Sequence, residues 1–312
     1  MYVSVIIPAY NAEKWLEKTL RSVLRQKYLR EIVIVDDHST DRTPQIARDF
    51  VRKYPLVVKY FVNPEKGANT ARNFGFLQSS GDFIQWLDAD DQLLDGKFEA
   101  QVVFMLENPA VDIVYSDWYM DFYDENLNLI ERKKVHEGQC EDMLYVLLQD
   151  KWKPNNSYLL RRGIAEKLHQ ISAWNPSTPV AQDREYFTLA ALEGARFAYV
   201  PGFFSVYNRW SSGQVSAMDF KRRLEFQVQL EKRFRDIILQ KPFPRRLKRK
   251  YLACLNAHVL NACFYHPGLT ITYPFSLFNV NWRLIHWKKY PFMPVIYTWQ
   301  ILKYALKNKI NN

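Results

Sequence analysis

The sequence predicts an α/β protein in which helices flank a mostly parallel central sheet, with a helical extension toward the C-terminus. Two observations predict this class. Over residues 1–115, short runs rich in Val and Ile alternate with segments of helical periodicity, and strands that alternate with helices generally pair in parallel. After residue 217 the pattern becomes helical and strongly basic.

Five β-rich runs are the predicted strands, at residues 3–8, 31–36, 57–61, 82–88 and 111–117. The predicted helices between them span residues 12–27, 43–53, 69–79 and 96–108. The first helix has Leu16, Leu20 and Val23 on one stripe, and the second opens with Thr43 and Pro44, which suit a first turn.

The pattern loosens after residue 118. We expect a hairpin around residues 124–126, a helix near residues 139–149, and another helix after Asp183 that Gly194 terminates. With 312 residues, of which 48% are apolar, the chain can bury a sizeable core. We expect a folded α/β domain over residues 1–216 and a basic, aromatic-rich helical region over residues 217–312.

The charge is distributed unevenly along the chain. The formal net charge is +10, but residues 221–312 carry 18 Lys and Arg against 3 Asp and Glu, and the rest of the chain is net acidic. Such asymmetry predicts an anionic partner for the C-terminal region, either nucleic acid or a lipid surface. No recognised nucleic-acid-binding module accompanies the basic runs, so we expect no nucleic-acid partner.

The C-terminal region also interleaves aromatic residues with lysines. A terminal helix would carry one apolar stripe, formed by Val295, Trp299, Leu302, Leu306 and Ile310. Lysines and aromatic rings around a short apolar stripe are typical of an interfacial helix, which predicts docking on an anionic membrane surface. The alternative is that these aromatic residues pack on the first domain or on a second subunit.

Localisation follows from three features of the sequence. The N-terminal residues lack a basic segment followed by a long apolar run, and no stretch reaches the roughly 18 apolar residues of a spanning helix. The three cysteines form no paired framework. We therefore expect a cytoplasmic protein, peripheral on the inner face of the cell membrane.

An acidic triplet follows the fourth predicted strand, in the stretch FIQWLDADDQLL. Asp88, Asp90 and Asp91 lie within four positions, and ligands of open α/β sheets bind beyond the carboxyl ends of the strands. Hard divalent cations such as Mn²⁺ or Mg²⁺ prefer carboxylate oxygens and complete their shell with water and phosphate oxygens. The triplet predicts a metal bound with a phosphate-containing ligand, although a turn with a helix cap is the simpler alternative.

Several phosphate-binding classes can be compared with this pattern. The sequence has no G-x-G-x-x-G and no G-x-x-x-x-G-K-S/T, so it does not match a dinucleotide-binding Rossmann fold or a P-loop protein. A phosphatase with an aspartyl nucleophile also places D-x-D after an apolar strand and stays open as an alternative.

Four ordered blocks carry a more specific resemblance. The blocks are VSVIIPAYNAEKWLEKTLRSVLRQ, EIVIVDDHSTDRT, KGANTARNFGFLQSSGDFIQWLDADDQLLDGKFE and AQDREYFTLAAL. Together they resemble the inverting glycosyltransferases of family 2, over roughly residues 2–216. The resemblance implies the GT-A fold, which is a Rossmann-like α/β fold, and a nucleotide-sugar donor, with UDP favoured. It also implies a saccharide or lipid-linked acceptor in the synthesis of a cell-surface polysaccharide.

The resemblance assigns the donor site residue by residue. Pro8, Ala9 and Tyr10 match the loop that lines the nucleotide base, and Asp37 matches the carboxylate that accepts a hydrogen bond from the base. Arg72 matches a basic residue near the diphosphate.

The remaining assignments concern the metal and the chemistry. Asp88 and Asp90 match the D-x-D that holds the ribose and the metal, with Asp91 as an adjacent metal residue. Asp183 matches the catalytic base. Such a base takes the proton of the acceptor hydroxyl in the transition state. A catalytically silent nucleotide-sugar binding module is the alternative that is not an enzyme.

Two positions depart from the family pattern. His38 stands where the family usually has Gly, and we interpret it as a tolerated turn residue. Trp210 stands near a His that can reach the metal or diphosphate in relatives, so Arg209 is the predicted diphosphate contact. The acceptor side is expected around Trp152, Lys153, Asn155, Asn156, Trp174 and Asn175, unless these residues simply pack in the core.

Overall fold

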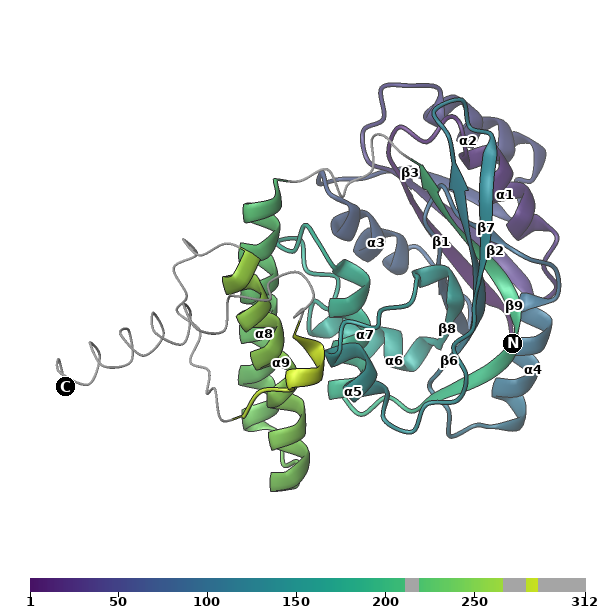
Figure 1. Ribbon diagram of the computed structural model, residues 1–312. Helices are drawn as coiled ribbons and strands as arrows, with labels where there is room; N and C mark the ends of the chain where they lie inside the picture. The colour runs from purple at the N-terminus through teal and green to yellow at the C-terminus, as the bar shows by residue number, and fades with distance from the viewer. Residues whose placement is uncertain (211–218, 266–278, 286–312) are drawn as a thin grey trace. The chain divides into compact units, whose positions relative to one another are not determined.

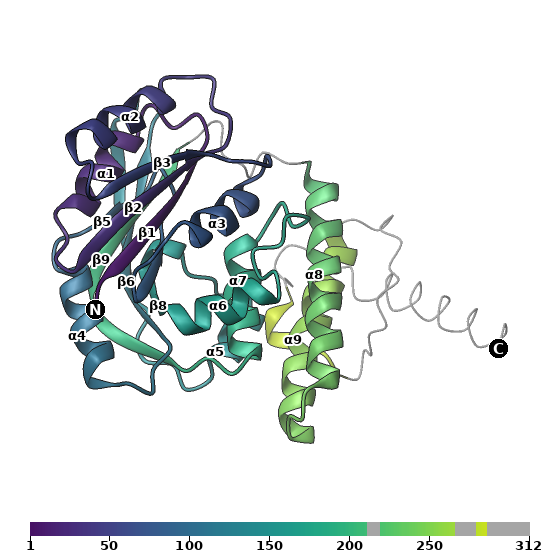
Figure 2. The same ribbon diagram turned by 180° about the vertical axis from the view of Figure 1, so that it is seen from behind.

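The computed structural model describes residues 1–210, 219–265 and 279–285. The chain divides into two compact units, Met1–Ala217 and Met218–Asn312. The first contains the sheet and is shown in two opposite views in Figures 1 and 2.

The first unit is built on one nine-stranded sheet with the order β3-β2-β1-β4-β8-β6-β9-β5, and β7 pairs with β6 outside this path. The strands are β1 (Val3–Ala9), β2 (Leu29–Asp36), β3 (Val58–Val62), β4 (Phe83–Trp86), β5 (Gln92–Leu93), β6 (Ile113–Tyr123), β7 (Leu129–Val135), β8 (Tyr158–Arg161) and β9 (Phe197–Trp210). Strands β1 to β4 are parallel, as are β6 and β9. The short strands β5 and β8 pair antiparallel with their neighbours.

The helices of this unit cover both faces of the sheet. They are α1 (Leu16–Leu24), α2 (Thr43–Lys53), α3 (Ala68–Leu77), α4 (Lys97–Glu107), α5 (Met143–Leu148), α6 (Arg162–Gln170) and α7 (Gln182–Leu192), with a 3₁₀ turn, η1 (Asn155–Ser157). Helices α1 and α4 lie on one side of the strands and α3, α6 and α7 on the other (Figures 1 and 2). The predicted α/β class is therefore confirmed.

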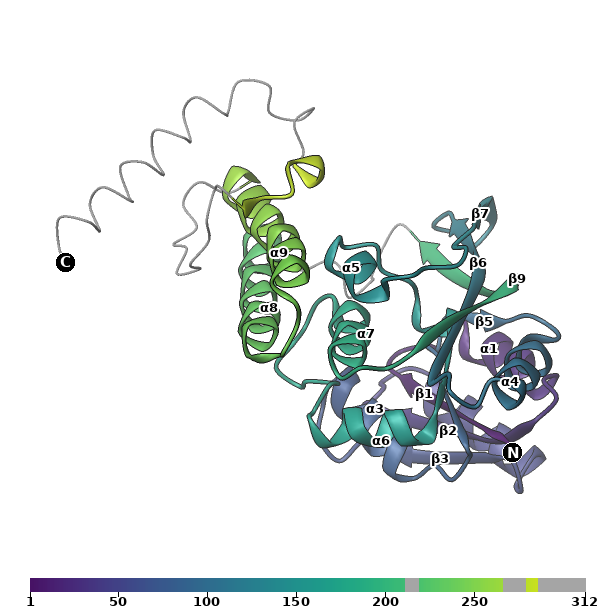
Figure 3. The ribbon, with the colours of Figure 1, turned by 90° about the horizontal axis from the view of Figure 1, so that it is seen from below.

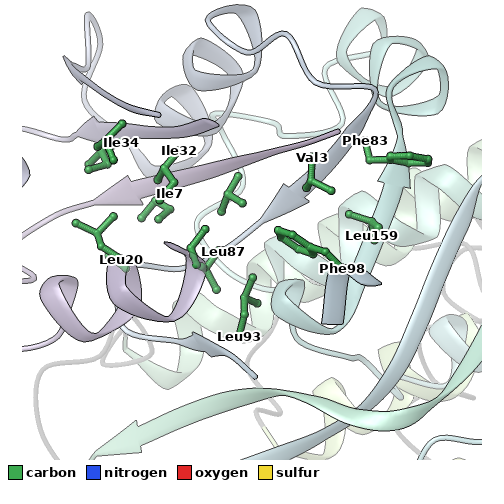
Figure 4. Close-up of a cluster of buried hydrophobic side chains, with 14 of the residues drawn as sticks. Val3, Ile7, Leu20, Ile32, Ile34, Phe83, Leu87, Leu93, Phe98 and Leu159 are labelled. Atoms are coloured by element: carbon green, nitrogen blue, oxygen red, sulfur yellow. The ribbon is translucent and has the colours of Figure 1, made fainter. Parts of the chain in front are cut away.

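Alternation along β1 explains how both faces are filled. Val3, Val5 and Ile7 are fully buried in a core shared with α1 and α4 (Figure 4). Ile6 points to the other face, where α3 packs so closely that a Cβ on Gly75 would meet Ile6 Cγ2 at 2.6 Å. A strand buried on both faces reads as a nearly continuous apolar run, and residues 3–7 do so except for Ser4, which is buried and donates to Glu31 at 2.7 Å.

The predicted elements of the first 115 residues are confirmed with small shifts at their ends. Helix α2 has the predicted bounds, whereas α1 begins at Leu16 because residues 12–15 form a turn before it. The hairpin prediction is confirmed by β6 and β7, and α7 begins one residue before Asp183. Strands β5, β8 and β9 were not predicted.

The second unit is helical where it is described. It contains α8 (Phe220–Gln240), α9 (Arg245–Tyr265) and a 3₁₀ turn, η4 (Trp282–Leu284), and α8 and α9 lie side by side in Figure 3. Phe234 and Ile238 of α8 are fully buried, as are Cys254 and Leu255 of α9. The predicted terminal helix over residues 295–310 lies outside the described residues. Among the described helices, none is long and apolar enough to cross a membrane.

Candidate active site

The acidic triplet forms a tight turn directly after β4. The Asp91 backbone N–H donates to the Asp88 carbonyl at 3.1 Å. Thr19 of α1 donates its hydroxyl to the carbonyl oxygens of Ala89 and Asp91, at 2.9 and 2.8 Å. Because one buried side chain bonds two carbonyls of the turn, the turn is fixed to the helix that follows β1.

Asp91 points into the protein. It is 1% exposed, and its two oxygens accept from the Asn208 backbone N–H at 2.9 Å and from Asn156 Nδ2 at 2.8 Å. Burial, followed by the charges of Asp90 and Asp88, raises its pKa well above the ordinary value. Both oxygens accept hydrogen bonds from within the protein, so Asp91 ties the turn to β9 and η1; its role as a metal ligand stays a prediction.

Asp88 faces Arg72 of α3. Arg72 is 5% exposed and its guanidinium forms an ion pair with Asp88 at 2.7 Å. The same guanidinium donates to Asn69 Oδ1 at 3.0 Å and to Gln182 Oε1 at 2.9 Å, and it lies 4.5 Å from the ring centroid of Trp174. Arg72 therefore has a fixed position between the acidic turn and the start of α7.

Asp90 and Asp183 complete the acidic cluster. Both are only partly exposed. Burial, together with the charge of Asp88, raises the pKa of each to about 7. Gln182, the first residue of α7, and Asp88 both contact the Arg72 guanidinium, so the first turn of α7 lies beside the acidic turn, which is 92 residues earlier in the chain. This cluster, formed by Asp88, Asp90, Asp91 and Asp183, is called the acidic cluster below.

The acidic cluster fits a cation that is held by one or two carboxylates, and not a metal ion enclosed by protein ligands alone. Over the described ranges, no group of three or more His, Cys, Asp or Glu is arranged to hold a metal. Burial and, after it, the Asp88 charge raise the pKa of Asp90 and of Asp183 despite the opposing charge of Arg72, and a bound cation would favour the ionised carboxylates. Mg²⁺ and Mn²⁺ are commonly held by one or two carboxylates, with substrate phosphates as further ligands, and the residues present fit that arrangement.

The predicted base-binding residues come together at the carboxyl ends of β1 and β2. The Asp37 backbone N–H donates to the Ala9 carbonyl at 2.7 Å. The Asp37 carboxylate is buried and accepts from Asn63 Nδ2 at 2.7 Å and from the Gly67 backbone N–H at 2.8 Å. Pro8 precedes Ala9 within β1, and Tyr10, which is 52% exposed, follows it with Lys66 Nζ 5.3 Å from its ring centroid.

The two departures from the family pattern have structural explanations. His38 has a φ of +62°, the left-handed region in which glycine is favoured and His is uncommon. The Trp210 ring stacks on Trp15 at 4.9 Å between centroids, with 14° between the planes, so it packs the end of β9 onto α1. Arg209 is exposed on β9, directly after the Asn208 that supports Asp91.

Most residues expected on the acceptor side are buried and contact other side chains of the protein. Trp174 is 2% exposed and stacks on Tyr186 at 4.2 Å, beneath the Arg72 guanidinium. Asn155 and Asn156 are buried, and Lys153 forms an ion pair with Glu137. Of the two tryptophans expected on the acceptor side, Trp152 is the exposed one, at 37%. The core alternative therefore holds for Trp174.

Three residues that hold the acidic turn or Arg72 in place were not predicted from the sequence. Thr19 lies in the middle of an amphipathic helix, and Asn208 lies in β9, a strand that was not predicted. Gln182 directly precedes Asp183 in the AQDREYF block, and its contact with Arg72 depends on how α7 packs.

The comparison with protein families decides the classification of this site. The model described as "Glycosyl transferase family 2" matches residues 4–164, which include both the base-side loops and the acidic turn. The chain belongs to this family. Asp183 lies beyond the matched region and is supported by its position in the acidic cluster. Family membership leaves the aspartyl-phosphatase alternative without support.

Curated relatives share this region. An uncharacterized glycosyltransferase of Haemophilus influenzae is 34% identical over 133 residues, which cover 42% of this chain and 53% of the relative. The putative teichuronic acid biosynthesis glycosyltransferase TuaG of Bacillus subtilis is 38% identical over 106 residues, covering 34% of this chain and 42% of TuaG. The matches thus span about half of these relatives or less.

Solved structures are similar over most of the chain. TarS 1–349 of S. aureus, in complex with UDP-GlcNAc, has a TM-score of 0.63 and 20% identity, covering 85% of this chain and 73% of that one. The mannosyltransferase PcManGT of Pyrobaculum calidifontis, in complex with GDP-Man and Mn²⁺, has a TM-score of 0.52 and 20% identity, covering 84% and 73%. These similarities confirm the GT-A fold.

Proposed function

We propose that the protein transfers a sugar from a nucleotide-diphosphate donor to a hydroxyl group of a saccharide or lipid-linked acceptor, with inversion at the anomeric carbon. The observation that carries this proposal is the meeting of Asp183 with the Asp88–Asp90 turn at the edge of the sheet where the base-side loops also end. A proton acceptor and a phosphate-side cation site are both needed for such a reaction.

Asp183 is the proposed base. Its carboxylate takes the proton of the acceptor hydroxyl while that oxygen forms a bond to the anomeric carbon. The bond from the anomeric carbon to the diphosphate breaks at the same time, and the electron pair leaves with the nucleoside diphosphate. Attack on the face opposite the leaving group inverts the anomeric centre.

Asp88 and Asp90 would hold a divalent cation, Mn²⁺ or Mg²⁺, together with the donor diphosphate. When bound, such a cation supplies Lewis-acid neutralisation of the charge that develops on the leaving group. Arg72 supplies a fixed positive charge on the same side, and Arg209 is a further proposed diphosphate contact. Asp91, engaged with Asn156 and Asn208, holds the turn in place.

Uracil is the proposed base of the donor nucleotide. Pro8, Ala9 and Tyr10 would line it, and Asp37 would accept its imide N–H through Oδ2, which within the described residues accepts only from the Gly67 N–H at 3.0 Å and so keeps a second lone pair. The TarS structures with UDP-GlcNAc and with UDP support this choice, and a GDP-Man complex of PcManGT makes GDP the alternative.

The acceptor is proposed to belong to cell-surface polysaccharide synthesis, as the printed roles of TuaG and of the minor teichoic acid biosynthesis protein GgaB suggest. The basic second unit is proposed to hold the enzyme at the anionic inner face of the cell membrane, where lipid-linked acceptors are presented. Residues 221–312 supply the positive charge for this contact.

The experiment is a transfer assay with UDP-Glc, UDP-GlcNAc, UDP-GalNAc and GDP-Man, each with Mn²⁺ and with a chelator. Release of nucleoside diphosphate identifies the donor, and NMR of the product gives the anomeric configuration. Loss of release with the chelator is expected. A product that retains the donor's anomeric configuration would refute the single displacement with Asp183 as base, and binding without release from any donor would favour the silent binding module.

A further inference from the structure

Three aromatic rings meet beside the acidic cluster. They belong to Trp118 of β6, Trp152 in the loop before η1, and Tyr207 of β9, and are called the aromatic platform. The ring centroids of Trp118 and Trp152 are 6.0 Å apart, and Tyr207 lies edge-on to both, at 5.9 and 5.6 Å. Trp118 is 3% exposed and Trp152 is 37% exposed, so Trp152 is the member that faces solvent most openly.

Tyr207 connects the aromatic platform to the reacting side of the site. Burial and then the charges of Asp91, Asp183, Asp88 and Asp90 raise its pKa. Asn208, the next residue of β9, donates its backbone N–H to Asp91 at 2.9 Å, so Tyr207 lies on a strand that holds the acidic turn. Trp152 contacts the Tyr207 ring, and Asn156, four residues after Trp152, donates to Asp91 at 2.8 Å. The segment that carries the exposed indole is therefore tied to the acidic turn at two points.

The platform is held rigidly from behind. Glu137 accepts from Trp118 Nε1 at 3.0 Å and forms an ion pair with Lys153, the residue after Trp152. Lys153 Nζ also lies 5.3 Å from the ring centroid of Tyr115. The Glu137 carboxylate, which is only partly exposed, thus holds both the indole of Trp118 and the residue that follows Trp152.

An exposed indole that is fixed in this way suits a ligand with an apolar face and polar edges. A pyranose ring has that chemistry, because its axial C–H groups cover one face while its hydroxyls lie around the rim. Aromatic side chains offer large contact area at low conformational cost. An acyclic polyol has no such rigid apolar face and would gain little from the same surface.

We propose that the aromatic platform binds a pyranose ring of the acceptor through Trp152 and presents one of its hydroxyls to Asp183. This inference rests on the proposed transferase function and adds a substrate class to it: the acceptor ends in a pyranose sugar and not in an acyclic polyol phosphate. Trp152 is the specificity residue of this subsite, and Glu137 is a positioning residue.

The test is saturation-transfer difference NMR with methyl β-D-glucopyranoside and methyl N-acetyl-β-D-galactosaminide, with ribitol and sorbitol as acyclic probes. Protein is kept with Mg²⁺, which is diamagnetic and does not broaden the ligand signals, and with the nucleoside diphosphate that it binds. The pyranosides are expected to show saturation on the C–H groups of one ring face, and the acyclic probes none. Trp152→Ala should reduce the signal at least fivefold, while Trp152→Phe should keep most of it.

Tyr2→Ala is the matched control. Tyr2 is 52% exposed and precedes β1 at the opposite end of the strand from Ala9, so its removal should leave the signal unchanged. Calorimetry of the same samples with the nucleoside diphosphate tests the transferase proposal separately, because Trp152→Ala should bind the nucleotide as the wild type does. Equal saturation of the acyclic probes, an unchanged pyranoside signal in Trp152→Ala, or loss of nucleotide binding in that variant would each overturn the pyranose assignment.

Discussion

Replacing Asp90 by Asn should stabilise the metal-free protein above neutral pH. Burial and the Asp88 charge raise the pKa of Asp90 to about 7 from an ordinary 3.8, so ionising Asp90 costs free energy in the folded state. At about 1.4 kcal/mol per pKa unit, the shift would correspond to about 4 kcal/mol at most. Partial exposure of Asp90 and relaxation of its neighbours reduce this value, and we expect about 1–2 kcal/mol.

The direction of the pH effect follows from proton binding. Between the ordinary pKa and about pH 7, folded Asp90 binds more protons than unfolded Asp90, so the free energy of unfolding falls as pH rises through this window and is constant above it. Asp183, with a pKa also raised to about 7, adds to the same slope. Urea unfolding of the wild type in chelator should therefore give higher stability at pH 5 than at pH 8.

Asp90→Asn should lose part of that slope and become the more stable protein at pH 8. Asp95→Asn is the matched control, since Asp95 lies just after β5 and its side chain is 77% exposed and pairs with Arg25 at the surface, where such pairs contribute about 0–1 kcal/mol. The same Asp90→Asn protein should lose stabilisation by Mn²⁺. An Asp90→Asn protein that is less stable than the wild type at pH 8, or that keeps the full slope, would refute the charge argument.

Three further predictions follow from the described contacts. Asp183→Asn should lower the transfer rate by about 10² to 10⁴-fold, while calorimetry should show nucleotide affinity within twofold of the wild type. The wild-type transfer rate should fall as the pH drops below the pKa of the base. The residual transfer rate of the variant should not show this fall at low pH. Thr19→Val should cost about 1–3 kcal/mol in urea unfolding, because two carbonyls of the acidic turn lose their shared donor; an unchanged midpoint would contradict this. Gly75→Ala should cost about 1–3 kcal/mol, since its Cβ would meet Ile6 at 2.6 Å, and a stability equal to the wild type would show that α3 can move.

Local patterns were sufficient for the N-terminal half of the fold. A few residues were enough to predict β1, from its largely apolar run, and α2, from the Thr43–Pro44 start. Strands β8 and β9 have no comparable signal, since β8 is four residues long and β9 is partly exposed. Their place in the sheet depends on pairing with β6, which lies more than 40 residues away from β8.

The candidate site was predictable as residue types but not as orientations. The D-x-D and Asp183 were identified from spacing and resemblance, and the structure brings them into one acidic cluster. The inward rotation of Asp91 depends on Asn156 and Asn208, which lie 65 and 117 residues away. Trp174 was expected near the acceptor and instead supports Arg72, because stacking on Tyr186 buries it.

The most direct test of the account is calorimetric titration of the protein with UDP in Mn²⁺ and in chelator, alongside Asp90→Asn. Saturable binding of UDP is expected to require Mn²⁺ and to be lost in Asp90→Asn, while Asp183→Asn binds as the wild type does. If GDP replaces UDP as the bound nucleotide, only the base assignment through Asp37 changes. Absence of binding by every nucleoside diphosphate tested, with Mn²⁺ or without it, would contradict the proposed function.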